Sequence, residues 1–461
     1  MTNEIKKLKL ARLRQFEHMS SINSNNKHIS FIKRNMIRYQ QLSAVYPEYK
    51  VYIFFLKRLT YKLKSLLALR VFPFKIAMSN KYTHSWKKKV ARDNLETFSY
   101  SILISGGLGD AIVIARLIRD LQIELDNSFA FDIYFHSPKN VIHFFKSIPG
   151  FREAINSELF DATKRYYCFS MRVNQFVTFE EEFIDYPTLI KHAPKVLNII
   201  AHAIATRRPI EKYIAATPFL DGAFADLFAK KGYRRQTFLH SMLDLPYGGD
   251  HLDLLIDYNL ITKLGLKIGS YITVHDGWDT KFPLLNARPV KSIPIDTWSK
   301  IVSEIKTKRP DLQIVQIGSN TGNDILGVDI NLKNKLTFFE AVSVLSNSRL
   351  HLDTESGLVH VAASIGVRSV VMFGPTSVEW FSYPQNINLA PKKCGNCWWM
   401  TDTWMDVCVL GYEIPICTTD SSIMPTEVAM SAITALNEQD GFIDTDHMNK
   451  FLESVKSVPF A

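Results

Sequence analysis

Short apolar runs alternate with longer segments of helical periodicity along most of the chain. "SYSILIS" (99–105) and "FAFDIYFHS" (129–137) predict two strands, and the stretch 110–123 between them has the spacing of a helix. The alternation returns after residue 270, where "YITVHDG" and "LQIVQIGS" are strand candidates on either side of the helical "IDTWSKIVSEIKTK". Strands that alternate with helices favour βαβ units and parallel sheets. The pattern therefore predicts an α/β protein with two doubly wound domains in tandem.

The regions between these units have weaker patterns. "YPTLIKHAPKVLNIIAHAI" (186–204) predicts one long helix, and residues 251–268 are the expected link between the domains. In such sheets ligands bind beyond the carboxyl ends of the strands, so the cleft between the domains is the expected site. The division that follows is a basic helical N-terminal extension (1–97), two Rossmann-like domains (98–266 and 267–440) and a C-terminal helical tail (441–461).

The N-terminal extension has a different pattern and a different charge. In "VYIFFLKRLTYKLKSLLALRVF" (51–72) the apolar positions 52, 55, 56, 59, 63, 66 and 67 form one helical stripe, accompanied by Lys57, Arg58, Lys62 and Arg70. Residues 1–97 contain 21 Lys and Arg against 5 Asp and Glu, so the chain's net charge of +10 arises here. A basic amphipathic helix can lie on an anionic membrane surface. It can equally pack on the main domain, and nucleic-acid binding is disfavoured because no recognised motif accompanies the charge.

Composition excludes several classes of protein. The 461 residues are 46% hydrophobic, which suits a globular protein, and no run of eighteen apolar residues predicts a transmembrane helix. The N-terminus lacks the apolar core of a secretory signal, and five cysteines are too few for a disulfide scaffold. We expect a cytoplasmic protein.

A glycine turn followed by an acid, "GGLGD", joins the first strand to its helix. Gly107 and Gly109 match the start of a dinucleotide fingerprint, but the third glycine is missing, which makes an oxidoreductase improbable. Asp110 at the helix start is stabilised by the helix dipole and the free N–H groups. It can be a plain helix cap, or an ionised carboxylate that serves as a general base.

The second candidate site is "DTESGLVHVAASIGVRSVVMFGPTS" (353–377). Ser356 and Gly357 open a helix whose backbone N–H groups can hold a diphosphate. His360 lies one turn further and can donate to a phosphate oxygen, while Glu355 can accept from sugar hydroxyls. Taken singly, His360 can be a core histidine and Glu355 a cap. Their combination with a second strand exit, "FGPT", favours a binding site, which adds Gly374 and Thr376 to the candidates.

Four cysteines follow in "CGNCWWMTDTWMDVCVLGYEIPIC", with the spacing C-x2-C-x10-C-x8-C. Clustered thiolates suit structural zinc or iron, whereas disulfides are disfavoured in the cytosol. Thiols without a metal are the remaining alternative. The candidate metal ligands are Cys394, Cys397, Cys408 and Cys417.

The order and spacing of these motifs resemble glycosyltransferase family 9, whose members include ADP-heptose:lipopolysaccharide heptosyltransferases. The resemblance rests on Gly107–Asp110, Glu355–Gly366 and Phe373–Thr376 and covers about residues 98–440. It implies a GT-B fold, with the acceptor bound by the first domain and the nucleotide sugar by the second. It also implies an inverting transfer in which Asp110 deprotonates the acceptor hydroxyl.

The resemblance further implies a lysine that neutralises the leaving diphosphate, for which Lys291 is the best match and Lys281 a weaker one. No cofactor is then required for transfer, because helix dipoles, lysine and histidine can carry the charge. Some related protein heptosyltransferases bind metal through a cysteine-rich segment, which agrees with structural zinc or iron here.

The resulting hypothesis is an inverting glycosyltransferase, peripheral on the inner face of the cytoplasmic membrane. It would move a sugar, heptose from ADP-heptose in the first instance, to a lipopolysaccharide or other surface-glycan acceptor, free or lipid-linked. Two alternatives stay open: a protein O-heptosyltransferase with a four-cysteine metal site, and a non-catalytic scaffold of the same family. Nucleic acid is not an expected partner.

Overall fold

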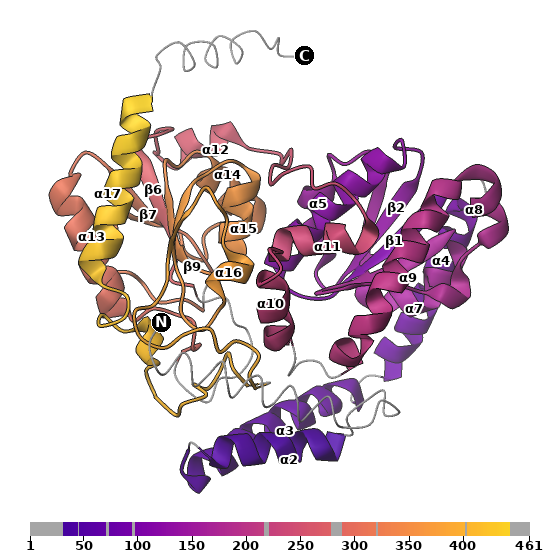
Figure 1. Cartoon of the computed structure of the whole chain (residues 1–461), viewed down its shortest axis with the longest axis horizontal. Helices are drawn as coiled ribbons and strands as arrows, with labels where there is room; N and C mark the ends of the chain where they lie inside the picture. Colours follow the sequence, from indigo (N-terminus) through magenta and orange to yellow (C-terminus); the bar gives the residue numbers. More distant parts are fainter. Residues whose placement is uncertain are drawn as a thin grey trace.

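The computed structural model describes residues 31–44, 46–70, 73–94, 97–215, 221–277, 288–319, 321–401 and 403–442. Within these ranges two separate sheets lie side by side, each covered by helices, and the helices α2 and α3 lie together along one side of the molecule (Figure 1). This confirms the two α/β domains predicted from the alternation of strands and helices, and it is the arrangement of the GT-B fold that the resemblance implies. The predicted C-terminal tail lies outside the described residues beyond Phe442.

The first sheet has the strand order β3-β2-β1-β4-β5. Pairs β1–β2, β2–β3 and β1–β4 are parallel, whereas β5 runs antiparallel to β4, so the expected purely parallel sheet is wrong at this edge. A three-residue connection between β4 and β5 leaves room only for a hairpin, because a parallel crossover needs a dozen residues or more. The strands are β1 (Ser99–Ile104), β2 (Ala130–Phe135), β3 (Phe151–Asn156), β4 (Phe169–Val173) and β5 (Val177–Phe179).

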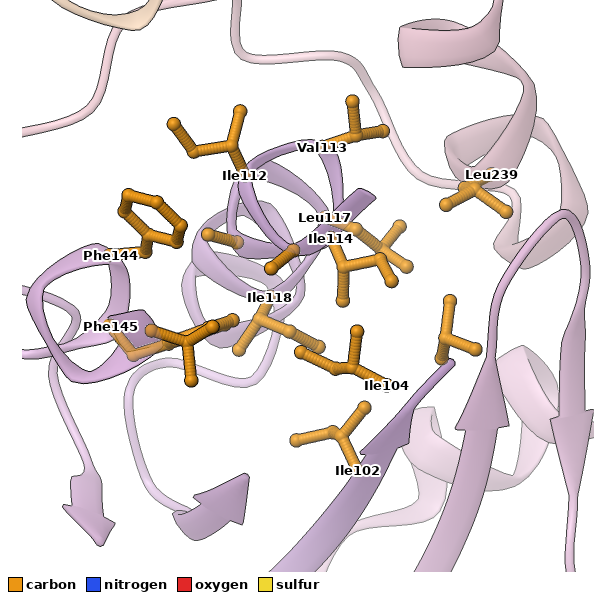
Figure 2. Packing of buried hydrophobic residues seen from close by; sticks show 14 of the residues in the cluster. Ile102, Ile104, Ile112, Val113, Ile114, Leu117, Ile118, Phe144, Phe145 and Leu239 are labelled. Carbon is orange, nitrogen blue, oxygen red and sulfur yellow. The ribbon is translucent and has the colours of Figure 1, made fainter. Parts of the chain in front are cut away.

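Helix α5 explains why this domain has a continuous core. Its sequence "AIVIARLI" is apolar on nearly every side, and residues from Ala111 to Ile118 are buried. Figure 2 shows Ile114 and Ile118 facing Ile104 and Ile102 of β1, with Phe144 and Phe145 to one side and Ile112 on the side of the helix away from β1. Helices and 3-10 turns of this domain are α5 (Leu108–Glu124), α6 (Pro138–Phe145), η1 (Ser157–Leu159), α7 (Phe160–Thr163), η2 (Lys164–Tyr166), η3 (Glu181–Phe183), α8 (Tyr186–His192), α9 (Pro194–Ala215), α10 (Asp221–Ala229) and α11 (Arg235–Leu243).

The single long helix predicted over 186–204 is wrong. Helix α8 ends at His192 and α9 begins at Pro194, which has no N–H to continue the hydrogen-bond ladder and disfavours helical geometry in Ala193. Pro209 is nevertheless accommodated inside α9. The break lets the two helices fold against each other instead of forming one rod.

The second sheet is parallel throughout, with the order β11-β10-β9-β6-β7-β8. From β6 the chain adds β7 and β8 successively toward one edge of the sheet. It then returns to the other side of β6 and adds β9, β10 and β11 toward the opposite edge, so the strand order reverses between β6 and β9. The strands are β6 (Tyr271–Val274), β7 (Gln313–Gln316), β8 (Ile330–Asn331), β9 (His351–Thr354), β10 (Ser369–Met372) and β11 (Ile387–Leu389). The helices are α12 (Tyr258–Lys263), α13 (Ile295–Lys308), α14 (Phe338–Ser346), α15 (Gly357–Ser364), α16 (Val378–Phe381), η4 (Ile416–Thr418) and α17 (Pro425–Phe442).

The two domains contact each other through helices. Helix α5 lies against α15, and α10 and α11 lie against α16, as the centre of Figure 1 shows. Phe144 of α6 meets Phe338 of α14 edge to face, at 5.4 Å between ring centroids. The apolar core is continuous across this boundary, so the carboxyl ends of both sheets are held next to each other.

The described part of the N-terminal extension consists of α2 (Phe31–Ser43), α3 (Glu48–Arg70) and α4 (Pro73–Asp93). Val51 and Phe54 of α3 are buried in a cluster with Val407 of the cysteine segment. Of the stripe identified in the sequence, Phe55 packs against this cluster, whereas Tyr52, Leu56, Leu59 and Leu63 are exposed. The expectation that this stripe packs on the main domain is therefore wrong at these four positions. Among the described helices, none is long and apolar enough to cross a membrane.

Candidate active site at the domain interface

The turn after β1 brings Asp110 to the end of the first sheet. Gly106 has a φ of +137°, and a Cβ built on it would lie 2.3 Å from Asp110 Oδ2, so only glycine fits. Gly107 N donates to Asp110 Oδ2 at 3.0 Å, which is the contact of a helix cap. The side chain of Asp110 is still 30% exposed, so the cap leaves the carboxylate accessible.

A buried arginine holds the other carboxylate oxygen. Arg235, at the first residue of α11, donates from Nη2 to Asp110 Oδ1 at 2.9 Å and to the carbonyl oxygen of Asn174 at 2.7 Å. Its side chain is 1% exposed. Charge-assisted hydrogen bonds of this kind are short and directional. Asp110 is therefore held from two sides, by a backbone N–H and by a guanidinium.

The turn after β9 forms the other half of the site. Ser356 caps α15, since its Oγ accepts from Leu358 N at 3.1 Å, and it donates to Asp353. Asp353 is fully buried and also meets His275 Nδ1 at 3.0 Å and His351 Nε2 at 3.2 Å. Burial alone raises the pKa of Asp353, but the two histidines outweigh it and hold that pKa below its usual range. An ionised, buried carboxylate thus anchors the loop that opens α15.

The two turns touch each other. A Cβ on Gly109 would lie 2.7 Å from His360 Cδ2, and one on Gly357 would lie 3.3 Å from Gly109 N. At Gly109 an added methyl group would force a shift, and at Gly357 it would make a tight contact; neither position has a left-handed backbone that would itself favour glycine. Asp110 and His360, 250 residues apart in the sequence, therefore belong to one site between the carboxyl ends of the two sheets, at the reversal of strand order in the second.

The remaining donor-side candidates gather around Glu355. Its Oε1 lies 3.7 Å from His360 Nε2, and its carbonyl oxygen accepts from Lys291 Nζ at 3.2 Å. The cap of α15 is Ser356 rather than Glu355, so the carboxylate is not used as a cap. Lys281 lies in 278–287, outside the described residues.

The loop after β10 rests on the cysteine segment. The carbonyl oxygen of Pro375 accepts from Trp398 N at 2.9 Å, and a Cβ on Gly374 would lie 3.2 Å from Thr418 Cγ2. Thr376 is buried, with 3% of its surface exposed. The cysteine segment thus supports the loop that follows β10.

The four clustered cysteines converge in space as well as in sequence. Each is at most 5% exposed, and no cysteine of the chain forms a disulfide. Burial first, and then the thiols of Cys397, Cys394 and Cys408, raise the pKa of Cys417 well above its usual value. Arg288 is half-buried near Cys417, and desolvation lowers the pKa of its guanidinium to about 10. Among the described residues no three His, Cys, Asp or Glu side chains are arranged as a ligand shell for a metal.

Three residues of the site were not predicted from the sequence. Arg116 and Tyr383 are both fully buried; Arg116 donates a hydrogen bond to the hydroxyl of Tyr383, which in turn contacts His360. Arg235 donates a hydrogen bond to Asp110. Arg116 has a signal in the sequence, because a charge in the apolar stretch "AIVIARLI" needs a buried partner. Arg235 and Tyr383 are on loops and helix ends with no local pattern.

A separate cavity of about 610 Å³ lies between α9 and α11. His202 and Thr206 of α9 and Phe238 and Ser241 of α11 are among its lining residues. None of the predicted site residues lines it, so it is not part of the Asp110–His360 site.

Comparison with known proteins supports the resemblance in the second domain. Residues 287–401 match the model of glycosyltransferase family 9 (heptosyltransferase). This segment contains Lys291, the Glu355–His360 turn, the Gly374–Thr376 loop and two of the four cysteines. No curated protein sequence matches the chain significantly.

Solved structures with a similar course of the chain include three glycosyltransferases. ADP-heptose lps heptosyltransferase II of E. coli is 14% identical (74% of this chain, 100% of that chain, TM-score 0.45). The glycosyl transferase family 9 protein of Veillonella parvula is 15% identical (74% and 98%, TM-score 0.48). The iron-containing dodecameric glycosyltransferase TibC of enterotoxigenic E. coli is 13% identical (75% and 77%, TM-score 0.47). At TM-scores below 0.5 these likenesses carry no conclusion about this chain. Within this two-sheet architecture, residues 287–401 of the second domain are therefore similar to glycosyltransferase family 9 (heptosyltransferase).

Proposed function

We propose that the protein is an inverting glycosyltransferase that moves heptose from ADP-heptose to a hydroxyl of a surface-glycan or lipid-linked saccharide. The observation that carries the proposal is the contact between the Gly109–Asp110 turn and His360. It puts an accessible carboxylate next to the candidate diphosphate-binding turn, which is the pairing that direct displacement at an anomeric carbon requires. The heptosyltransferase description of the matching family supports the choice of donor.

The chemistry divides between the two turns. Asp110 would take the proton of the acceptor hydroxyl as its oxygen attacks the anomeric carbon. The bond from that carbon to the diphosphate breaks on the opposite face, and the diphosphate leaves with the electron pair. Backbone N–H groups of Ser356 and Gly357 at the start of α15, together with Lys291 and His360, would stabilise the charge that develops on it. These groups supply the electrostatics of the step without a cofactor.

The other candidates would hold the donor. The carboxylate of Glu355 lies near His360 Nε2 and can accept hydrogen bonds from sugar hydroxyls. Gly374 and Thr376 follow β10, the next strand of the sheet, and would bind the donor there, since Gly374 has no side chain to keep a ligand from the backbone. Gly107 and Gly109 would leave room for the acceptor and sugar on the Asp110 side.

The test is transfer from ADP-heptose by purified protein, with released ADP and product mass as readouts. We expect D110N to lower kcat at least about 100-fold, the usual contribution of a general base. The matched control is D126N, since Asp126 is exposed in a turn with a left-handed backbone that asparagine also adopts. Full transfer by D110N would overturn the assigned base.

The acceptor is tested in the same assay. Saccharide acceptors and serine-containing polypeptides are offered separately, and a mass increase of one heptose identifies the class. Modification of polypeptides alone would replace the saccharide proposal with protein O-heptosylation. Binding of ADP without turnover on any acceptor would favour the scaffold.

We propose secondly that the four clustered cysteines hold a structural zinc or iron ion. Their donor set fits a metal ion, because four buried sulfurs lie close enough to influence one another and the half-buried guanidinium of Arg288 would offset part of a thiolate charge. Binding would draw the thiols closer together than they are in the described structure. We expect about one metal ion per chain by elemental analysis, lost in C417S and retained in C168S. Metal-free protein with unchanged melting temperature would contradict the proposal.

We propose thirdly that α3 attaches the protein to the inner face of an anionic membrane. Tyr52, Leu56 and Leu59 are more than half exposed, next to the exposed Lys57 and Arg58. Each basic residue near an anionic leaflet contributes about 1 kcal/mol. We expect sedimentation with phosphatidylserine vesicles that weakens with salt and is lost in an L56E/L59E variant. Equal sedimentation of variant and wild type would remove α3 as the anchor.

A further inference from the structure

A buried chain of hydrogen bonds connects α5 of the first domain to His360 of the second. Arg116 Nη1 donates to the hydroxyl of Tyr383 at 2.7 Å, and this hydroxyl lies 2.6 Å from His360 Nδ1. Arg116 and Tyr383 are completely buried, and His360 is 6% exposed. Buried hydrogen bonds of this kind must be satisfied with consistent donors and acceptors.

The direction of the chain follows from chemistry. A guanidinium has only N–H donors, so the oxygen of Tyr383 must be the acceptor toward Arg116. Burial raises the pKa of Tyr383, so its phenol keeps its hydrogen at neutral pH. The nearest partner for that hydrogen is His360 Nδ1, which must then be the acceptor. In a neutral imidazole the proton is therefore on Nε2.

Protonation of the imidazole would break this arrangement. A hydrogen on Nδ1 would point at the oxygen of Tyr383, which already accepts a hydrogen bond from Arg116. The hydroxyl hydrogen of Tyr383 would then have lost its acceptor, Nδ1. The titratable or charged groups that face the imidazole are Tyr383 on Nδ1 and Glu355 near Nε2, with Arg116 behind Tyr383. Lys291 meets only the carbonyl oxygen of Glu355, at 3.2 Å.

We propose that Arg116 and Tyr383 are positioning residues that select the tautomer of the His360 imidazole with its proton on Nε2, directed at the diphosphate of the donor. The Nε2–H lies between Gly109 and Glu355, 3.7 Å from the Glu355 carboxylate and so beyond a normal hydrogen bond to it. It is thus available to a ligand oxygen in the cleft. The identity of that ligand rests on the proposed function, whereas the tautomer does not.

Arg116 is itself fixed from both domains. Its Nε donates to the carbonyl oxygen of Asp250 at 2.6 Å, and its Nη2 donates to the carbonyl oxygen of His360 at 3.2 Å. All three guanidinium nitrogens are used, and Nη1 also lies 3.6 Å from Asp250 Oδ1. An arginine of the acceptor-side domain therefore sets the hydrogen-bonding state of a donor-side histidine, and the site is complete only when the two domains are together.

The test is the protonation state of His360 in full-length protein, read by nitrogen NMR of histidine-labelled samples, with H360Q to assign the signal. We expect wild-type His360 to carry its proton on Nε2. In Y383F the imidazole loses this constraint, so both tautomers appear. Affinity for ADP should fall roughly tenfold in Y383F at pH 8.

The matched control is Y271F, which removes the equally buried hydroxyl that donates to the carbonyl oxygen of Val344 at 2.6 Å. It should lower the melting temperature comparably and leave the His360 signal unchanged. A proton on Nδ1 in the wild type, or the same tautomer in wild type and Y383F, would overturn the inference. A correct tautomer together with no turnover of ADP-heptose would instead count against the proposed function.

Discussion

At the residue scale, the site depends on buried charges that have partners on other elements. Asp120 of α5 is 5% exposed and accepts from His240 Nε2 at 2.8 Å, Arg119 Nε at 2.8 Å and Gly248 N at 2.9 Å. Burial alone raises the pKa of Asp120, but these hydrogen bonds outweigh it and lower the pKa to about 2. Asp120 thereby ties α11, which carries Arg235, to the helix that carries Asp110.

This lowered pKa predicts a pH-dependent contribution to stability. A carboxyl group with a depressed folded-state pKa stabilises the protein above its unfolded-state pKa near 4 and loses that contribution as the pH falls toward 2. The contribution is about 2 kcal/mol at pH 7. We expect D120N to lower the free energy of unfolding by about this amount at pH 7 and by about half as much at pH 3.

Denaturant unfolding at the two pH values measures the difference. D253N is the control, because Asp253 has an exposed side chain and no buried partner network. An equal loss for D120N at both pH values would show that its effect is not one of ionisation.

At the element scale, α3 shows how a helix can pack by a face that its periodicity does not single out. Its apolar residues are spread around the helix, so more than one face could be buried. The structure buries Val51 and Phe54 against Val407 and leaves Leu56 exposed. Docking on the cysteine segment decides the orientation, and it leaves an apolar and basic face uncovered.

This packing predicts unequal effects of two neighbouring truncations. F54A removes a side chain that is 3% exposed and should weaken the docking of α3 by about 3 kcal/mol. L56A changes a side chain that is 60% exposed and should alter stability by less than about 0.5 kcal/mol. Limited proteolysis of the N-terminal extension should therefore accelerate in F54A only. Comparable proteolysis rates in F54A and L56A would mean that α3 does not pack on the main domain through Phe54.

At the scale of the whole molecule, the candidate active site is a contact between domains. Gly109 lies so close to His360 that a methyl group cannot be added without movement, and His360 is held from behind by Tyr383. The backbone of Gly109 itself is compatible with alanine. The close approach of the domains is therefore the only requirement for glycine here.

G109A is predicted to separate the two domains. A displacement of about 1 Å at a reacting centre can reduce turnover about 100-fold, and we expect a loss of that order. Small-angle scattering should show a larger radius of gyration for G109A. The steric control for this shape change is G107A, since a Cβ on Gly107 meets nothing within 4 Å. Unchanged scattering and turnover in G109A would mean that His360 gives way instead.

The sequence by itself determined the alternation of strands and helices, the two α/β domains and the motifs at the ends of β1 and β9. These depend on local periodicity and on glycines and caps, which act within a few residues. Ser356 and Gly357 opening α15 are a case in which local chemistry decided the structure. The hairpin strand β5 and the break at Pro194 are also local, and were missed because the flanking apolar pattern was weak.

Only the tertiary structure decided which polar residues meet. Arg235 reaches Asp110 from 125 positions away, and Arg116 reaches Tyr383 from 267 positions away. No local pattern encodes such pairs, because a buried charge can find its partner on any element that the fold brings near. The same holds for the contact of Gly109 with His360, which exists only because two domains, each predictable alone, are packed together.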